Sequence, residues 1–252
     1  MYNCKDTCTL YNRQQMAGTD GQSVTGKKPL TPEMVVGRAL ALADTGGLGV
    51  VTIRRLAGDL GVTPMALYWH FRNKDELLDA MMSRVLAEVD LTLDESATWL
   101  EQFRALMDSL SGVLLAHPGI APLFATRTNS SESSLRMTEV ALDTLRRGGF
   151  SPTEATQVAR HALSTVVNLV VGEPGFIAPD DSGELLDARR RARVFLEALP
   201  PDRFPRLVEA AAPLSAREDP DAYYEFGLDL LLAGIGEMAA RNKSGPITRE
   251  HR

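Results

Sequence analysis

The stretch Ile53–Arg72 reads IRRLAGDLGVTPMALYWHFR and contains the signals of two short helices joined by a tight turn. Thr52 is placed to cap the first helix, and Gly61 can end it because glycine enters the left-handed conformation at little cost. Thr63 then caps a second helix that has Pro64 in its first turn, where a missing N–H does no harm. This layout predicts a helix-turn-helix, whose second helix lies in the DNA major groove; the alternative is an ordinary helical corner.

Several side chains around this motif are candidates for DNA contact. Arg54 lies next to the capped start of the first helix, and its planar guanidinium suits the O6/N7 edge of guanine. Arg55 is the next residue on the helix, so its side chain points in another direction and can stay solvated. On the second helix, Tyr68 and His70 suit phosphates, apolar residues suit thymine methyl groups, and Trp69 is expected to be half buried. The predicted DNA-binding set is Thr52, Arg54, Thr63, Pro64, Met65, Ala66, Tyr68, Trp69, His70 and Lys74.

The charge distribution supports this interpretation better than the total charge does. The chain has a net charge of −6, which by itself argues against a nucleic-acid partner. The stretch from Thr52 to Lys74, however, contains four basic residues and one acidic residue, so its net charge is +3 and the remainder carries −9. A locally basic segment on an acidic protein directs DNA to one face.

The composition is that of a globular protein with one or two domains. It has 252 residues, of which 44% are hydrophobic, and it shows no apolar run of about 18 residues that would predict a membrane span. The amino end shows no signal peptide, so a cytoplasmic location is expected. Residues 1–30 are predicted to form a disordered tail in which Cys4 and Cys8 are reduced, and residues 242–252 a second tail. Whether the basic residues of the first tail reach DNA is left open.

Residues 31–79, and most specifically the segment LYWHFRNKDELLDA at 67–80, resemble the N-terminal domain of the TetR family of bacterial repressors. The resemblance continues more loosely to about residue 240. It implies a helix-turn-helix DNA-binding domain over residues 31–79 and a linking helix that continues to about residue 90. It also implies a ligand-binding and dimerisation domain over residues 91–241.

Residues beyond 90 lack the alternating pattern of strands, so the predicted fold class is all-α, with a three-helix DNA-binding domain followed by a larger helical domain. Loops are expected at 174–183 and at the proline-rich stretch 200–218. The helices are predicted near residues 96–116, 118–125, 130–147, 151–172, 184–199 and 219–241.

Two of these helices, at 155–171 and 222–240, are apolar on nearly all sides. A helix without a polar face must be covered on both sides, so one side is expected to pack within the chain and the other against a second copy. Gly227, Gly234 and Gly236 keep the last helix thin enough for close approach. The pattern predicts a homodimer with a four-helix bundle between subunits, as the resemblance also implies; a monomer is the alternative.

A polar stripe crosses the first of these two helices. His161, Thr165 and Asn168 recur at helical spacing, and Glu173 follows. Such groups either bond one another and a partner chain or contribute the few polar contacts of an apolar ligand cavity. Aromatic and aliphatic residues at 103–124 and Phe176 are candidates for its walls.

The resemblance narrows the predicted effector. Thr126-Arg127 and Glu173 match residues of the tetracycline-responsive members, but Leu123 and Asp90 stand where those members have histidines that hold metal or drug. One outer carboxylate cannot hold a hard cation, so no metal, no cofactor and no magnesium–tetracycline ligand are predicted. A polyaromatic or amphipathic small-molecule effector is expected instead. The predicted effector-binding set is Phe103, Leu106, Leu110, Leu123, Phe124, Arg127, His161, Thr165, Asn168 and Glu173.

The predicted function is a ligand-responsive transcriptional repressor that binds a palindromic double-stranded DNA operator as a homodimer. Effector binding is expected to move the segment 118–125 and thereby the linking helix 73–89. Two alternatives remain open: an architectural or effector-independent DNA-binding protein, and an all-helical enzyme using His161 and Glu173 as an acid–base pair. The sequence shows no nucleophile elbow, phosphate loop or metal-ligand spacing that would favour an enzyme.

Overall fold

The computed structural model describes residues 29–127, 131–171, 183–216 and 219–243. Within these ranges every regular element is helical, which confirms the all-α fold class, and none of the helices is long and apolar enough to cross a membrane. Residues 1–28 of the predicted tail 1–30, residues 174–182 of the predicted loop 174–183 and the position Glu173 lie outside the described residues, as does Phe176.

The first four α-helices and one short 3-10 helix form a unit that we call the head, residues 32–86. Its elements are α1 (Pro32–Gly46), the short 3-10 helix η1 (Leu48–Val50), α2 (Ile53–Leu60), α3 (Pro64–Tyr68) and α4 (Lys74–Leu86). α1 packs against both α2 and α4, and α2 packs against α3. The linking helix is shorter than predicted, because α4 ends at Leu86 and the chain continues as turns.

Apolar side chains at helical spacing make the core of the head. α1 buries one face with Val35, Ala39 and Leu42, and α4 buries Leu77 and Met81. α4 begins where the sequence allows, since the Asn73 side chain accepts a hydrogen bond from the Glu76 N–H at 2.8 Å. This core holds the α2–α3 motif in place.

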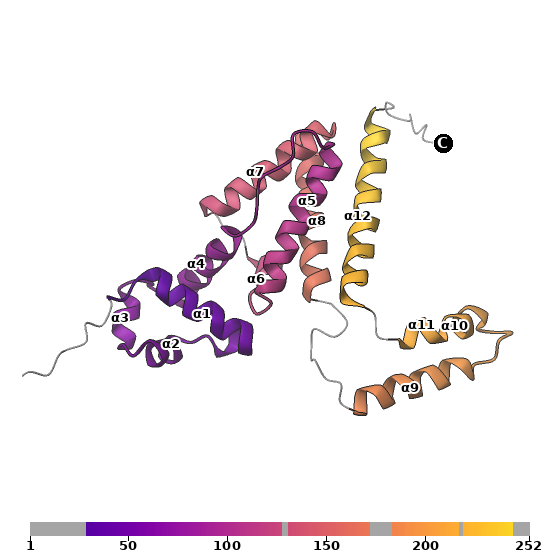
Figure 1. The fold of residues 1–252 in the computed structure, drawn as a ribbon, viewed down its shortest axis with the longest axis horizontal. Coiled ribbons are helices and arrows are strands. Elements are labelled where there is room, and N and C mark those ends of the chain that lie inside the picture. The colour runs from indigo at the N-terminus through magenta and orange to yellow at the C-terminus, as the bar shows by residue number, and fades with distance from the viewer. Residues whose placement is uncertain (1–28, 128–130, 172–182, 217–218, 244–252) are drawn as a thin grey trace, which may run out of the picture. The chain divides into compact units, whose positions relative to one another are not determined.

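Five further helices form a second unit that we call the body. They are α5 (Trp99–Ala116), α6 (Leu123–Thr126), α7 (Glu132–Arg147), α8 (Pro152–Val171) and α12 (Pro220–Lys243). α5 packs against α7 and α8, and α12 runs beside α8 and α5 (Figure 1). The predicted helix at 118–125 is only partly helical: turns occupy residues 118–122, and α6 begins at Leu123.

Between α8 and α12, residues 183–216 contain three helices, which we call the arm: α9 (Gly183–Glu197), α10 (Pro205–Glu209) and α11 (Ala211–Ser215). α9 packs against α10 and α11. The prediction of a loop at 200–218 was therefore wrong for residues 205–215. Two of the four prolines that suggested a loop lie in first helical turns, where no N–H partner is needed: Pro205 begins α10 and Pro213 is the third residue of α11. Pro200 and Pro201 lie between α9 and α10.

The expectation that two helices are apolar on nearly all sides is wrong for α8 and only partly met by α12. α8 buries one face but exposes a polar face that includes Gln157, Ser164 and Asn168. α12 buries Leu228, Leu232, Ile235 and Ala239, and its outer side is largely apolar, interrupted by the exposed Glu237. This outer apolar stripe consists of Phe226, Leu230 and Met238, all exposed, together with Ala233 and Gly234.

Candidate nucleic-acid interface and effector domain

The turn between α2 and α3 has the geometry that its residues predict. The Thr52 hydroxyl accepts a hydrogen bond from the Arg55 N–H at 3.2 Å, and the Thr63 hydroxyl accepts one from the Ala66 N–H at 3.3 Å. Gly61 has φ 63° and ψ 37°, a left-handed conformation that costs glycine little. These contacts confirm the predicted caps and turn, and they fix the direction in which α3 leaves α2.

The tip of α3 points outward. Met65 is 66% exposed, Tyr68 47% and Trp69 84%, and Pro64 is exposed as well. Leu67 on the opposite side is fully buried. The prediction that Trp69 is half core was wrong, because α3 ends at Tyr68 and the next residue carries its ring away from the head. A short helix with an apolar anchor and an outward aromatic tip is suited to enter a groove.

The other predicted DNA contacts lie around this tip. Thr52, Thr63 and Lys74 are exposed, whereas Ala66 and His70 are half buried. The Lys74 ammonium lies 3.5 Å from the backbone oxygen of Leu48 and can also donate to a phosphate.

The two arginines at the start of α2 have different surroundings. Arg55 lies 3.4 Å from Asp59, and Arg38 of α1 donates to the same carboxylate from Nε at 3.0 Å and from Nη2 at 2.6 Å. Arg54 is exposed and forms no ion pair with any described residue. Arg54 is therefore the arginine of this pair that can bind DNA without breaking a contact, while the Arg38–Asp59 pair joins α1 to α2.

The loop after α5 contacts the carboxyl end of α1. His117 Nδ1 lies 3.0 Å from Asp44 Oδ2, His117 Nε2 lies 3.4 Å from Glu88 Oε2, and the Gly119 N–H donates to Asp44 Oδ1 at 3.3 Å. The backbones approach so closely that a Cβ on Gly119 would lie 2.0 Å from the carbonyl oxygen of Ala43. We call this contact the α1 joint. It connects the body to the head, and it leaves no room for a side chain at position 119.

A second contact joins α6 to α4. Arg127 donates from Nη1 to Asp75 Oδ1 at 2.8 Å and from Nη2 to Asp79 Oδ1 at 3.1 Å. The hydrogen bond with Asp75 is the main cause that raises the pKa of Arg127 above its ordinary value. Arg127 was predicted to bind the effector, but its guanidinium is engaged by α4, because the two carboxylates are one helical turn apart and match the arginine fork.

The structure does not bring the predicted effector residues together around one cavity. Phe103, Leu106 and Leu110 were expected to form cavity walls, and this prediction was wrong for the conformation described: they are fully buried where α5 meets α7 and α8, with almost no surface left for a ligand. Leu123 and Phe124 are also buried, on α6, which packs against α8.

The polar members of the set lie elsewhere on α8. His161 and Asn168 are exposed, and Thr165 is half buried and donates its hydroxyl to the backbone oxygen of His161 at 2.8 Å. Glu173 lies outside the described residues. The polar stripe is thus a surface of this chain.

Sequence reasoning missed the residues that connect distant helices. Asp75, Asp79 and His117 bind partners between 29 and 73 positions away in the chain, so local patterns could not reveal them. One signal was present: two carboxylates separated by four residues on one helix form a paired acceptor for arginine, as in Asp75 and Asp79.

The fold and the exposed α3 tip together define a class of protein: a helix-turn-helix DNA-binding protein with an attached helical domain. The comparisons with known proteins agree. The family described as bacterial regulatory proteins, tetR family, matches residues 36–81, and the tetracyclin repressor-like C-terminal domain matches residues 92–239. The chain therefore belongs to the TetR family.

Individual relatives cover most of the chain. An HTH-type transcriptional regulator of Saccharopolyspora erythraea is 29% identical over 84% of this chain and 87% of its own. The class A tetracycline repressor of Escherichia coli is 31% identical over 86% of this chain and 96% of its own. The solved structure of ActR from Streptomyces coelicolor in complex with actinorhodin is similar with a TM-score of 0.74, at 30% identity over 84% of this chain and 99% of the other. The protein is thus a transcriptional regulator of the TetR family, with the family's DNA-binding domain at residues 36–81.

Proposed function

We propose that two copies of this protein bind a palindromic operator through their α3 helices and release it when a small molecule binds the body. The exposed tip of α3, with its buried anchor Leu67, is the observation that carries this proposal. We propose the cytoplasm as its location, since that is where a bacterial repressor meets its operator.

The residues proposed to touch DNA are those exposed on or beside α3, together with Arg54. Met65, Tyr68 and Trp69 enter the groove or contact its edge, and Thr52 and Lys74 contact phosphates. The half-buried Ala66 and His70 lie beside the tip and are proposed to contribute through their exposed atoms.

The replacement Arg54→Ala tests this assignment. We expect operator binding to weaken by about 1–3 kcal/mol and specificity to relax at one base position, because a bidentate contact with a guanine is lost. Selection of bound sequences from random DNA, followed by affinity measurements on single-base variants, shows both effects. Arg55→Ala is the matched control and should weaken binding less, because Arg55 is paired with Asp59. Equal loss in the two variants would contradict the assignment.

The homodimer is proposed to form through the outer apolar stripe of α12 and the neighbouring exposed face of α8. A single DNA-binding module buries roughly 600–1,000 Å², which seldom gives tight specific binding. Two heads held one helical turn apart, about 34–36 Å, would read both halves of a palindrome. Phe226 and Leu230 leave a contiguous apolar surface on α12 that a second copy can cover.

The effector is proposed to be a polyaromatic or amphipathic small molecule. The structure of ActR has been solved in complex with actinorhodin, and several relatives are tetracycline repressors. The ligands in the names of these similar proteins are multi-ring compounds. Leu123 in place of a metal-binding histidine is the reason that magnesium–tetracycline itself is not proposed. We place the ligand beside α6, where Leu123 and Phe124 pack towards α8 and Thr165 is half buried.

Arg127 is proposed to transmit the effector signal from α6 to α4. When Arg127→Gln removes the paired hydrogen bonds to Asp75 and Asp79, a ligand should still bind, but it should change operator affinity much less than in the unmodified protein. Couplings between two binding sites are typically about 1–3 kcal/mol, which corresponds to about 5–150-fold in affinity. In Arg127→Gln the ligand should leave the operator affinity almost unchanged.

The measurement is an operator-binding titration with polyaromatic compounds, with ligand affinity measured separately by calorimetry. Arg136→Gln is the control, since among the described residues Arg136 pairs with Glu132 on its own helix, at 2.5 Å. If Arg127→Gln responds like the unmodified protein, the signal does not pass through this pair. A protein whose operator affinity is changed by none of the compounds tested would favour the effector-independent alternative.

A further inference from the structure

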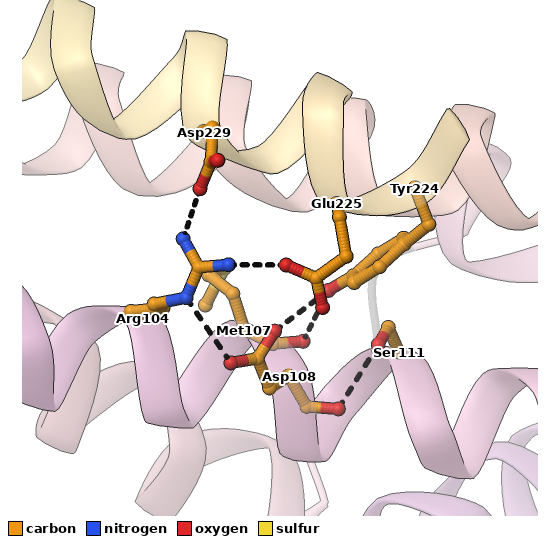
Figure 2. Close-up of polar contacts among 7 residues, drawn as sticks. All are labelled: Arg104, Met107, Asp108, Ser111, Tyr224, Glu225 and Asp229. Carbon is orange, nitrogen blue, oxygen red and sulfur yellow. Dashed lines mark hydrogen bonds and ion pairs between the residues drawn. The ribbon is translucent and has the colours of Figure 1, made fainter. Parts of the chain in front are cut away.

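A charged cluster joins the first helix of the body to the last. We call it the Arg104 cluster, and it consists of Arg104 and Asp108 of α5 with Glu225 and Asp229 of α12. Arg104 donates from Nη1 to Asp229 Oδ1 and from Nη2 to Glu225 Oε2 at 2.5 Å, and its Nε lies 3.6 Å from Asp108 Oδ2. Figure 2 shows the guanidinium lying between the two helices with its nitrogens turned to three carboxylates.

The geometry of the cluster restrains α12 in two directions. Glu225 and Asp229 are four residues apart and so lie one turn apart on one face of α12. One planar guanidinium reaches both, so neither sliding of α12 along α5 nor rotation about its axis preserves both hydrogen bonds. The buried apolar face of α12 supplies affinity for the body, but apolar contacts are non-directional and do not define this position as sharply.

A tyrosine adds a second point of attachment. The Tyr224 hydroxyl lies 3.3 Å from Asp108 Oδ1 and 3.4 Å from the backbone oxygen of Met107, so its hydrogen can be donated to either (Figure 2). Burial raises the pKa of Tyr224 to about 12, which keeps the hydroxyl a donor. Burial also raises the pKa of Asp108, while Arg104 acts in the opposite direction and favours the charged carboxylate.

The cluster contributes little to the stability of the chain. The side chains of Glu225 and Asp229 are 59% and 64% exposed, and ion pairs at such positions are weakened by water and salt. Because the Arg104 cluster is directional but stabilises the fold only weakly, its role is better explained as setting the orientation of α12. The element that it orients, α12, carries the outer apolar stripe at Phe226 and Leu230, which directly follow Glu225 and Asp229 in sequence and so lie about 100° further round the helix.

We infer that Arg104 is a positioning residue for dimerisation: it holds α12 at one height and one rotation against α5, and thereby sets the distance between half-sites that the dimer reads. The inference rests on the proposed homodimer. One added base pair moves a half-site by about 3.4 Å and turns it by about 35°, so a small rotation of α12 at the dimer axis changes which operator fits.

The experiment uses the full chain and a series of duplexes whose two half-sites, obtained by selection from random DNA, are separated by spacers that differ by single base pairs. The unmodified protein should bind one spacing best. Arg104→Gln should bind several spacings almost equally, so that the affinity ratio between the best spacing and its neighbour falls by about tenfold, within the range known for coupled sites. Its thermal midpoint should change little.

Two further variants make the result specific. Arg104→Asp places four carboxylates together and should lose the spacing preference, whereas Arg104→Asp combined with Asp229→Arg restores the net charge and the bridge and should regain it. Arg136→Gln is the matched control, because Arg136 pairs with Glu132 on its own helix α7 at 2.5 Å, outside α12, and should leave the preference unchanged. The double variant Glu225→Gln with Asp229→Asn removes the charged partners on α12 and leaves Arg104 in place. It should lose the spacing preference as Arg104→Gln does, and it provides the test if Arg104→Gln itself folds poorly.

The outcomes separate this inference from the proposed function. An unmodified protein that is monomeric, or that shows no spacing preference, overturns the proposed dimer. If the unmodified protein has a preference and Arg104→Gln retains it, or Arg136→Gln loses it to the same degree, the positioning role of Arg104 is wrong and the dimer stands.

Discussion

The variant Leu230→Glu should be monomeric and should bind the operator about a thousandfold more weakly than the unmodified protein. Leu230 is 67% exposed and lies in the middle of the outer apolar stripe of α12, so a charge there would be buried in the proposed interface without a partner. A monomer retains one head, and single modules have affinities close to nonspecific binding. The stability of the monomer should change by no more than about 0.5 kcal/mol, as for other surface substitutions.

Sedimentation of the free protein and operator titration at one fixed salt concentration measure these two effects. Leu135→Glu provides the control, since Leu135 on α7 is exposed to a similar degree, 60%, and lies outside the stripe. It should leave both the dimer and the operator affinity intact. A dimeric Leu230→Glu protein would mean that the subunits meet through another surface.

The second large effect is expected at the α1 joint. In Gly119→Ala the new Cβ would lie 2.0 Å from the Ala43 oxygen and 2.7 Å from the Asp44 nitrogen, and both are backbone atoms that cannot turn aside. The loop must move away from α1 and lose the contacts of His117 and Gly119 with Asp44. We expect a loss of about 1–3 kcal/mol in the free energy of unfolding and a further loss of operator affinity as the head changes its orientation.

Chemical denaturation gives the first quantity and operator titration the second. Gly112→Ala serves as the control, because Gly112 lies within α5 and a Cβ there meets nothing within 4 Å. Alanine in an open helical position should stabilise the protein by about 0.4–1 kcal/mol. Equal behaviour of the two variants would show that the α1 joint relaxes freely.

The head could be predicted from the sequence because its signals are local. Thr52, Gly61 and Thr63 each act on backbone groups within five positions, and the structure places each contact as expected. The exposure of the α3 tip followed from the spacing of Leu56, Ala57 and Leu67. The exception was Trp69, which stands just beyond the end of its short helix, where helical spacing no longer decides which way a side chain points.

The body was predicted less completely because its decisive contacts are distant in sequence. Helix positions followed from periodicity, but whether Phe103 faces a ligand or a neighbouring helix depends on how α5, α7 and α8 pack. The partners of Arg104 are 121 and 125 positions away, and those of Arg127 are 48 and 52 positions away. Periodicity can show that a helix has an arginine on its surface, but it cannot identify the carboxylate that it meets.

The two hydrogen bonds from Arg38 to Asp59 have a consequence for motion. They join α1 to the first helix of the motif, and the packing of α2 on α3 extends the connection to the DNA-facing tip. A rotation of α1 by the body should therefore carry the tip through the same angle, with little bending inside the head. Tolerance for imperfectly spaced half-sites must then come from where the head meets the body, and not from elasticity within the DNA-binding domain.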